Sequence, residues 1–125
     1  MLKKENRLKS KRAFIATYNN RNIIGSDIIT MYAGKIKTDK NCPTRVGFVV
    51  SKKVHKRAVK RNKIKRILRE IFRLEFKNNE IETIQNYQSL ILLAKEGILE
   101  KNSEEIRNTI LILLDKLAIT AKTRA

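Results

Sequence analysis

Positively charged side chains are concentrated between Lys52 and Arg69, a segment we call the basic stretch. Every charged residue in it is positive, and there are ten of them. Arginine presents a planar fork that matches two phosphate oxygens, whereas lysine acts as a point charge. The chemistry that these residue types predict is binding of a polyanion through its phosphates. The ten residues are Lys52, Lys53, Lys56, Arg57, Lys60, Arg61, Lys63, Lys65, Arg66 and Arg69.

Apolar residues run through and beyond the basic stretch at helical spacing. At about 100° per residue, Ile64, Ile67, Leu68, Ile71, Phe72 and Leu74 share one arc of a helical wheel. Asn62, Lys65, Arg66, Arg69 and Arg73 fall on the other side. This pattern predicts a helix at about residues 56–78, with one face on a core and the other a fixed block of cations. Such a face repels itself by a few tenths of a kcal/mol per i,i+4 pair, which favours a polyanionic partner over a solvated surface.

The whole chain shares this charge bias. It has 125 residues, a net charge of +17 and an isoelectric point near 10.4. Nucleic acid is the expected partner, and an anionic membrane is the weaker alternative. The length predicts one domain over residues 1–125, with residues 1–6 and 119–125 flexible. Because we find neither a signal peptide nor an apolar run long enough to span a bilayer, we expect a soluble cytoplasmic protein with no membrane partner.

Residues that would cut a phosphodiester bond do not form a recognisable group. His55 is the only histidine and has no acid–base partner at a useful spacing, so we expect no more than a loop contact from it. Cys42 is the only cysteine, which excludes an internal disulfide and a cysteine-based metal site. The carboxylates are scattered and form no metal-holding cluster. We therefore expect no catalytic residue, no tightly bound metal and no small-molecule substrate.

The remaining segments predict the elements that position the basic helix. We expect a short helix over 12–18, strands over 28–33 and 45–51 joined as a hairpin with its tip at 38–41, a central strand over 87–95, and a helix from about 103 to 118. Residues 23–27 and 80–86 are expected to be connectors, and Ser103 is a candidate cap. Phe48, Phe72 and Phe76 are assigned to the core. The order predicts an α/β (α+β) two-layer sandwich with a small mixed central sheet.

Several of these residues form an ordered motif. The run Arg45–Lys53, RVGFVVSKK, is followed by Arg61-Asn62-Lys63, Lys65-Arg66 and Arg69-Glu70. Together they resemble the signature of the bacterial ribonuclease P protein subunit, and Asn6-Arg7-Leu8 fits as well. One departure is Lys63, where the family has arginine, so positive charge is kept without the planar fork. The resemblance implies an unusual left-handed βαβ crossover through the basic helix, in a fold like that of the second domain of ribosomal protein S5.

The same resemblance implies a function. The family's protein assists a catalytic RNA that removes the 5′ leader of precursor tRNA, with Mg²⁺ held mainly by the RNA. The expected partners are therefore this RNA and precursor tRNA. The implied RNA-binding residues are those of the basic stretch together with Asn62, which would order phosphates or a metal-bound water. The implied leader-binding cleft contains Phe14, Tyr18, Tyr32 and Ser51, and aromatic stacking is worth about 1–3 kcal/mol per base.

Other interpretations remain open on the residues alone. Phe14 would equally suit core packing, and Asn62 would suit a helix cap. A ribosomal or RNA-chaperone protein, or a DNA-binding protein, explains the charge as well. A free-standing nuclease is the alternative of a different class, and it requires an active site that we do not find. Only the joint occurrence of the VSKK strand end and the Arg-Asn-Lys helix start favours ribonuclease P.

Overall fold

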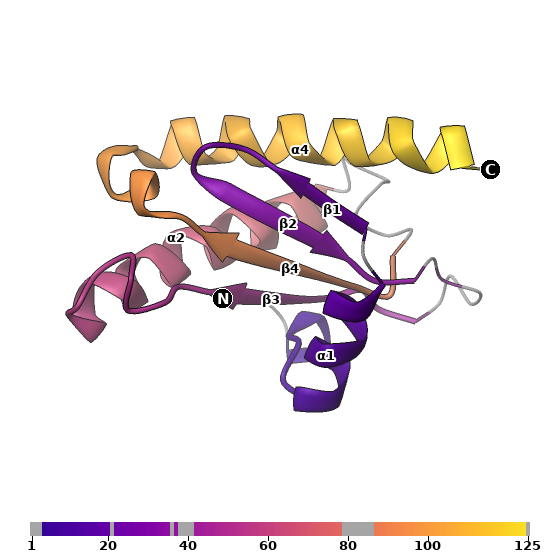
Figure 1. Cartoon of the computed structure of the whole chain (residues 1–125), viewed down its shortest axis with the longest axis horizontal. Helices are drawn as coiled ribbons and strands as arrows, with labels where there is room; N and C mark the ends of the chain where they lie inside the picture. The colour runs from indigo at the N-terminus through magenta and orange to yellow at the C-terminus, as the bar shows by residue number, and fades with distance from the viewer. Residues whose placement is uncertain (1–3, 21, 36, 38–41, 79–86, 125) are drawn as a thin grey trace.

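The computed structural model describes residues 4–20, 22–35, 37, 42–78 and 87–124, with the side chains of 76–78 and 118–124 left out. Within these residues the chain forms a four-stranded sheet packed against helices (Figure 1). The elements in order are η1 (Lys4–Asn6), α1 (Lys11–Asn19), β1 (Asn22–Gly25), β2 (Ile29–Ala33), β3 (Arg45–Val49), α2 (Ala58–Asn78), β4 (Ser89–Ala94), η2 (Glu96–Glu100) and α4 (Ser103–Arg124).

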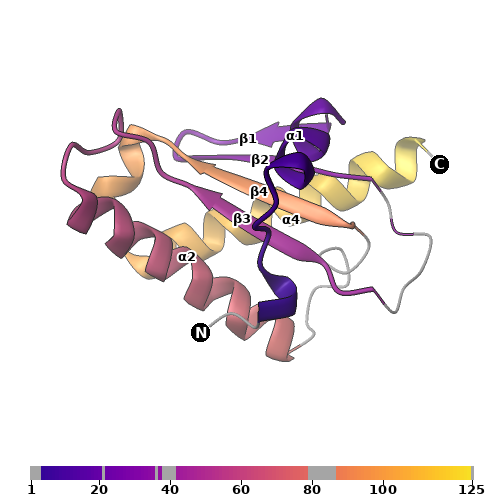
Figure 2. The same cartoon turned by 90° about the horizontal axis from the view of Figure 1, so that it is seen from below.

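The sheet has the strand order β1-β2-β4-β3. β2 is antiparallel to both of its neighbours, whereas β3 and β4 are parallel. Parallel neighbours require a crossover, and here the crossover contains α2. With strands β3 and β4 both running to the left in Figure 1 and α2 behind them, the crossover is left-handed, as the resemblance implied and against the usual rule (Figures 1 and 2).

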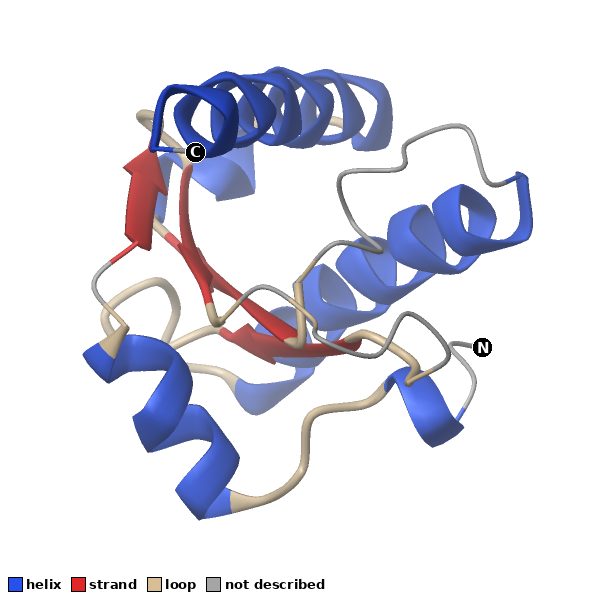
Figure 3. Cartoon of the chain, turned by 90° about the vertical axis from the view of Figure 1, so that its right-hand side faces the viewer, coloured by secondary structure: helices blue, strands red, loops and turns tan. Residues whose placement is uncertain are grey.

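The helices divide between the two faces of the sheet. α2 and α4 cover one face, and α1 lies across the other (Figure 3). The α+β class, the mixed sheet and the central position of the 87–95 strand are therefore confirmed. The principal core lies between the sheet and α2 with α4, where β4 contributes Leu90, Leu92 and Ala94. The packing of α2 and α4 on the sheet was predictable because each of these helices carries one apolar stripe that must be buried.

The apolar stripe of α2 packs on this core as predicted. Leu68 and Phe72 are fully buried, and the ring of Phe72 meets that of Phe48 edge-to-face at 5.7 Å between centroids. Leu74 was wrongly assigned to the stripe and is exposed. The buried residue on this turn is Glu75, whose Oε1 accepts hydrogen bonds from Arg107 of α4. The side chain of Phe76 lies outside the described part.

Two predictions about the sheet were wrong. Residues 22–25, which were expected to be mostly connector, form the edge strand β1 and pair with β2. Strands β2 and β3 do not form a hairpin, because β4 lies between them and pairs with both. The expected hairpin tip at 38–41 and the expected connector at 80–86 lie outside the described residues.

The C-terminal helix was predicted with the correct stripe and incorrect ends. Ile106, Ile110, Leu113, Leu114 and Leu117 are all buried in the core. Asn102 is the cap in place of Ser103: its Oδ1 accepts the N–H of Glu105 at 2.8 Å. The helix runs on to Arg124 and does not end near Ala118.

The N-terminal segment is held against the edge of the sheet. Asn6, expected in the flexible terminus, is buried, and its Nδ2 donates to Thr44 O at 2.9 Å. Leu8 N–H then donates to Val46 O at 3.0 Å, so this segment continues the sheet beyond β3. Flexibility of the other terminal residues stays a prediction.

Because Glu75 is buried and Arg107 is its ion-pair partner at 3.2 Å, we predict that Arg107→Ala lowers the free energy of unfolding by about 1–3 kcal/mol. The carboxyl group would remain buried between α2 and α4 without that partner. Urea denaturation at constant anion concentration measures the change. Lys101→Ala is the matched control, since it removes the exposed pair with Glu105 and should cost less than about 0.5 kcal/mol. Equal losses in the two variants would contradict this role of Arg107.

Candidate nucleic-acid interface

The basic stretch begins in a loop that is anchored to the core. Val54 is buried, and its N–H donates to Ser51 O at 3.0 Å, which closes a turn. Lys52 and Lys53 occupy this turn and are exposed. Both lysines are therefore solvent-exposed on a hydrogen-bonded turn at the C-terminal end of β3, and the buried Val54 anchors this turn.

Hydrogen bonds tie the rest of this loop to the first turns of α2. Arg61 Nη1 donates to His55 O at 2.9 Å and to Lys56 O at 2.8 Å. His55 Nδ1 accepts the N–H of Arg57 at 3.0 Å. His55 is thus a loop contact, as expected, and one nitrogen of Arg61 is engaged in holding the loop. The side chains of Lys56 and Arg57 remain exposed.

The outer face of α2 is a continuous cationic surface. Asn62 is exposed in the second turn, and since α2 begins at Ala58 it cannot be the helix cap. Arg61 and Lys65 are half-buried. The exposed members of the face are Lys60, Asn62, Lys63, Arg66 and Arg69. Within the described residues, Arg66 and Arg69 form no ion pair, so no described carboxylate neutralises their charge.

One carboxylate lies on this face, and it is paired. Glu70 accepts from Arg73, whose Nη2 lies 2.6 Å from Oε1 and whose Nε lies 3.1 Å from both oxygens. This hydrogen bonding lowers the pKa of Glu70 and raises the pKa of Arg73. The pair is neutral overall, and it leaves the charges of Arg66 and Arg69 without a competing acid.

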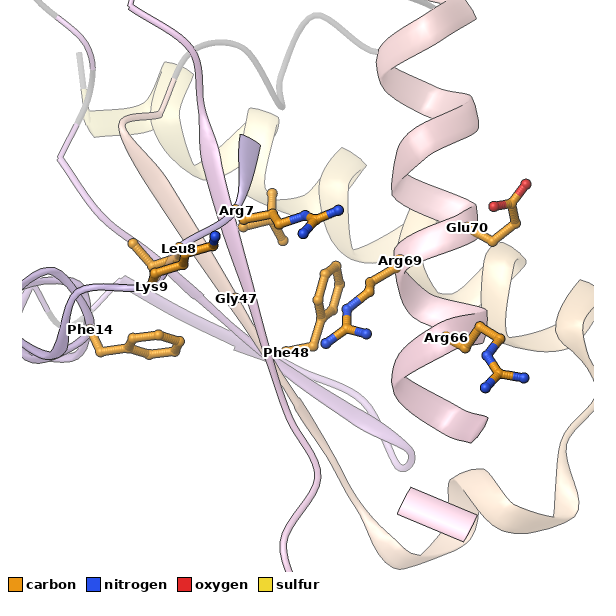
Figure 4. Close-up of a pocket in the computed structure, with 10 residues that line it drawn as sticks. Arg7, Leu8, Lys9, Phe14, Gly47, Phe48, Arg66, Arg69 and Glu70 are labelled. Atoms are coloured by element: carbon orange, nitrogen blue, oxygen red, sulfur yellow. The ribbon is translucent and has the colours of Figure 1, made fainter. Parts of the chain in front are cut away.

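A cleft of about 720 Å³ lies beside the cationic face of α2 (Figure 4). Its cations come from two separate segments, namely Arg7 and Lys9 near the N-terminus and Arg66 and Arg69 on α2. Apolar side chains and the backbone of β3 complete it. The other lining residues are Leu8, Phe14, Val46, Gly47, Phe48 and Glu70.

The predicted aromatic residues gather on the sheet face that carries α1. Tyr18 and Tyr32 meet edge-to-face, with ring centroids 4.8 Å apart. Both rings are half-buried, and burial together with the neighbouring Tyr32 raises the pKa of Tyr18. Tyr18 therefore keeps its proton at neutral pH and can offer an aromatic face and a hydroxyl donor.

Phe14 lies one helical turn before Tyr18 and packs on β3. A Cβ added to Gly47 would lie 2.5 Å from its ring, so only glycine leaves room for this contact. Gly47 and Tyr32 both align with Ile91 of β4, so they share one row across the sheet. Because Phe14 contacts one end of this row and Tyr18 the other, α1 crosses the strands. Ser51 is exposed beyond the end of β3 and is not part of the aromatic contact.

The basic residues near the N-terminus were missed as site residues. Arg7 and Lys9 were read as part of a basic terminus, yet they line the same cleft as Arg66 and Arg69. The only signal in the sequence was the Asn6-Arg7-Leu8 motif. The motif does not indicate that Leu8 pairs with Val46, because local sequence patterns do not reveal contacts between distant segments.

The described part of the chain contains no group of three or more His, Cys, Asp or Glu side chains placed to hold a metal ion. Among the same residues, no helix has the length and apolar character needed to cross a bilayer.

We predict that Gly47→Ala lowers the free energy of unfolding by about 1–3 kcal/mol, because the ring of Phe14 must move to admit the methyl group. Chemical denaturation measures this loss. In a Phe14→Leu background the same glycine change should cost at least about 1 kcal/mol less, since coupled neighbours are not additive. Equal losses in the two backgrounds would show that Phe14 does not require Gly47.

Comparison with known proteins agrees with this geometry. The model of the Ribonuclease P family matches residues 2–118. The ribonuclease P protein component of Alkaliphilus oremlandii is 34% identical over 93% of this chain and 94% of its own length, and that of Clostridium kluyveri is 31% identical over 90% and 95%. The RNase P protein of Staphylococcus aureus superposes with a TM-score of 0.72 at 27% identity, covering 90% of this chain and 94% of that one. The chain therefore belongs to the ribonuclease P protein family.

Proposed function

We propose that this chain is the RNA-binding subunit of a ribonucleoprotein endonuclease that removes the 5′ leader of precursor tRNA, and that a partner RNA carries out the cleavage. The observation that carries the proposal is the cationic face of α2, on which Arg66 and Arg69 are exposed without a described carboxylate partner. Family membership favours this function over a ribosomal, chaperone or DNA-binding role.

The role of the basic face is electrostatic. Two RNA molecules repel each other, and a surface that neutralises several phosphates lowers the cost of bringing them together. The core-bound stripe of α2 holds the cations in place before the RNA arrives, so little ordering is needed on binding. Asn62, exposed among these cations, would donate from its amide to a phosphate oxygen or accept from a metal-bound water. In this proposal the RNA holds the Mg²⁺ ions.

The tyrosine pair suits the single-stranded leader. Its bases have exposed aromatic faces, and Tyr18 and Tyr32 present half-buried rings beside one another on an outer surface of the sheet. Stacking on such rings tolerates many sequences, as a subunit that processes many precursors requires. Phe14 is anchored on Gly47 and forms the end of this aromatic group. The absence of membrane and small-molecule partners and the cytoplasmic location stay predictions.

Reconstitution tests the proposed function. The full chain is mixed with a bacterial ribonuclease P RNA and a precursor tRNA, at a magnesium concentration too low for the RNA alone. We expect cleavage at the mature 5′ end in the mixture and none with protein alone. Activity of the protein alone would overturn the assignment of chemistry to RNA. If neither sample cleaves while the protein still binds RNA tightly, the ribosomal or chaperone function is favoured.

We predict that Tyr18→Ala weakens binding of precursor tRNA with its leader by about 5- to 150-fold, corresponding to about 1–3 kcal/mol of lost stacking. Binding of mature tRNA, which has no leader, should change less than twofold (about 0.4 kcal/mol). Equilibrium binding to the reconstituted complex measures both. Ile15→Ala is the matched control, because Ile15 is an exposed apolar residue of the same helix. An equal loss for mature tRNA would show that Tyr18 does not contact the leader.

A further inference from the structure

Helix α1 is attached to the sheet in a different way from α2 and α4, which cover the opposite face (Figure 3). Of its nine residues, all of which the structure describes, only Thr17 is buried. None of them belongs to the core cluster that α2 and α4 share with the sheet, and Ile15 is half exposed. Phe14 fixes the first half of α1 on Gly47. The second half, which carries Tyr18, is held mainly by polar contacts.

A pair of hydroxyl groups joins this second half to β4. Thr17 Oγ1 lies 2.5 Å from Ser89 Oγ, and the same Thr17 oxygen donates to Ala13 O at 2.8 Å. A hydroxyl group has one hydrogen to donate, so Ser89 is the donor and Thr17 the acceptor between the two side chains. Ser89 is the first residue of β4, and Ser89 O accepts the N–H of Gly34 at 2.8 Å. The sheet therefore presents one directed, well-anchored donor to α1.

A second hydrogen bond holds the end of the helix. Asn20 Nδ2 donates to Ala33 O of β2 at 3.1 Å, and Ala33 directly follows Tyr32. Tyr18 therefore lies between two anchored positions, Thr17 on β4 and Asn20 on β2. The ring of Tyr18 meets that of Tyr32 edge-to-face at 4.8 Å between centroids. Because such a contact depends on the relative position of the rings, a shift of α1 would change the aromatic surface that the pair presents.

The strand register places the donor beside the tyrosine pair. Ser89 and Ile91 are alternate residues of β4, so their side chains lie on the same face of the sheet. Ile91 aligns with Tyr32, so Ser89 occupies the neighbouring row. Room for its hydroxyl depends on Gly34, because a Cβ at that position would collide with Ser89 Oγ. Loss of the hydroxyl would thus loosen α1 and leave the core beneath α2 and α4 intact.

We propose that three residues, Ser89, Thr17 and Asn20, are positioning residues for leader binding. They hold Tyr18 against Tyr32 and so set the aromatic surface that is offered to a single-stranded leader. Ser89 and Thr17 act through the placement of α1, since each uses its hydroxyl within the protein. This role rests on the proposed function of the tyrosine pair. A merely structural role would instead weaken the binding of every RNA, with or without a leader.

The first test is equilibrium binding to the reconstituted complex. Ser89→Ala should weaken binding of precursor tRNA with its leader by about 3- to 10-fold and that of mature tRNA by less than about twofold, since one hydrogen bond is lost. Thr17→Ser keeps the acceptor and should restore affinity to within about twofold of the parent. Thr109→Val is the matched control, because Thr109 Oγ1 donates to Glu105 O within α4, as Thr17 does within α1. An equal loss of affinity for precursor and mature tRNA in Ser89→Ala would overturn the proposal.

A double-mutant cycle decides whether Ser89 acts through Tyr18. In a Tyr18→Ala background, Ser89→Ala should change binding of the leader-bearing precursor by less than about twofold, because the ring that it positions is gone. A loss as large as in the parent background would show that Ser89 affects RNA by another route, and the positioning role would be wrong.

The placement of the rings is measured separately by NMR of the full-length protein at constant anion concentration. We expect nuclear Overhauser effects between the rings of Tyr18 and Tyr32 to weaken in Ser89→Ala and Asn20→Ala and to be unchanged in Thr109→Val. Asn20 is exposed, so its variant should keep the fold even if Ser89→Ala does not. Unchanged effects between the rings in Asn20→Ala and Ser89→Ala would overturn the proposal.

The two proposals fail separately. If reconstituted cleavage is absent while Ser89→Ala still weakens the contact between the rings, the placement of α1 stands and the tRNA-processing function falls. If cleavage is present and Tyr18→Ala shows its leader-dependent loss while Ser89→Ala changes neither binding nor the ring contact, the positioning role falls and the processing function stands.

Discussion

Repulsion among the cations of α2 is the constraint on which the rest of the structure depends. A helix with this surface is stable because burial of Ile64, Leu68 and Phe72 outweighs the repulsion, at about 1.5–3 kcal/mol per large apolar side chain. The net charge of +17 adds a repulsion that reaches every element. The fold keeps its cations outward and its one buried acid on α2, Glu75, paired with α4. Binding of a polyanion would reduce this repulsion, so the exposed cations that oppose folding are also the groups suited to bind RNA.

Local periodicity was sufficient to predict what lies within single elements. The stripe of α2 and that of α4 were correct because a helix repeats its buried positions along the chain. The central strand was recognisable as a continuous apolar run, since β4 is covered on both faces, by the core on one side and by α1 on the other. The basic face followed from the same wheel. For these features the polarity of each residue is enough to indicate whether its side chain is buried or exposed.

Features that depend on distant pairing were not predictable. Residues 22–25 form a strand only because β2 offers them an edge, and β3 lost its expected hairpin partner because β4 intervenes. Phase errors of one residue explain two other misses: Glu75 is buried where Leu74 was expected, and Asn102 caps where Ser103 was expected. The cleft was missed because Lys9 and Arg69 are far apart in sequence. They meet only when the N-terminal segment lies along β3.

The position of β4 between β2 and β3 has a consequence for how the chain folds during synthesis. Both strands precede β4 in sequence by many residues, and each pairs with it over its whole length. Until the ribosome has released residues 89–94, β2 and β3 present open edges that invite pairing with other chains. The contact order of the sheet is correspondingly high, which slows folding. The nascent chain would therefore be most liable to misassembly before β4 emerges from the ribosome. The rate at which residues 50–94 are translated would set the length of this interval.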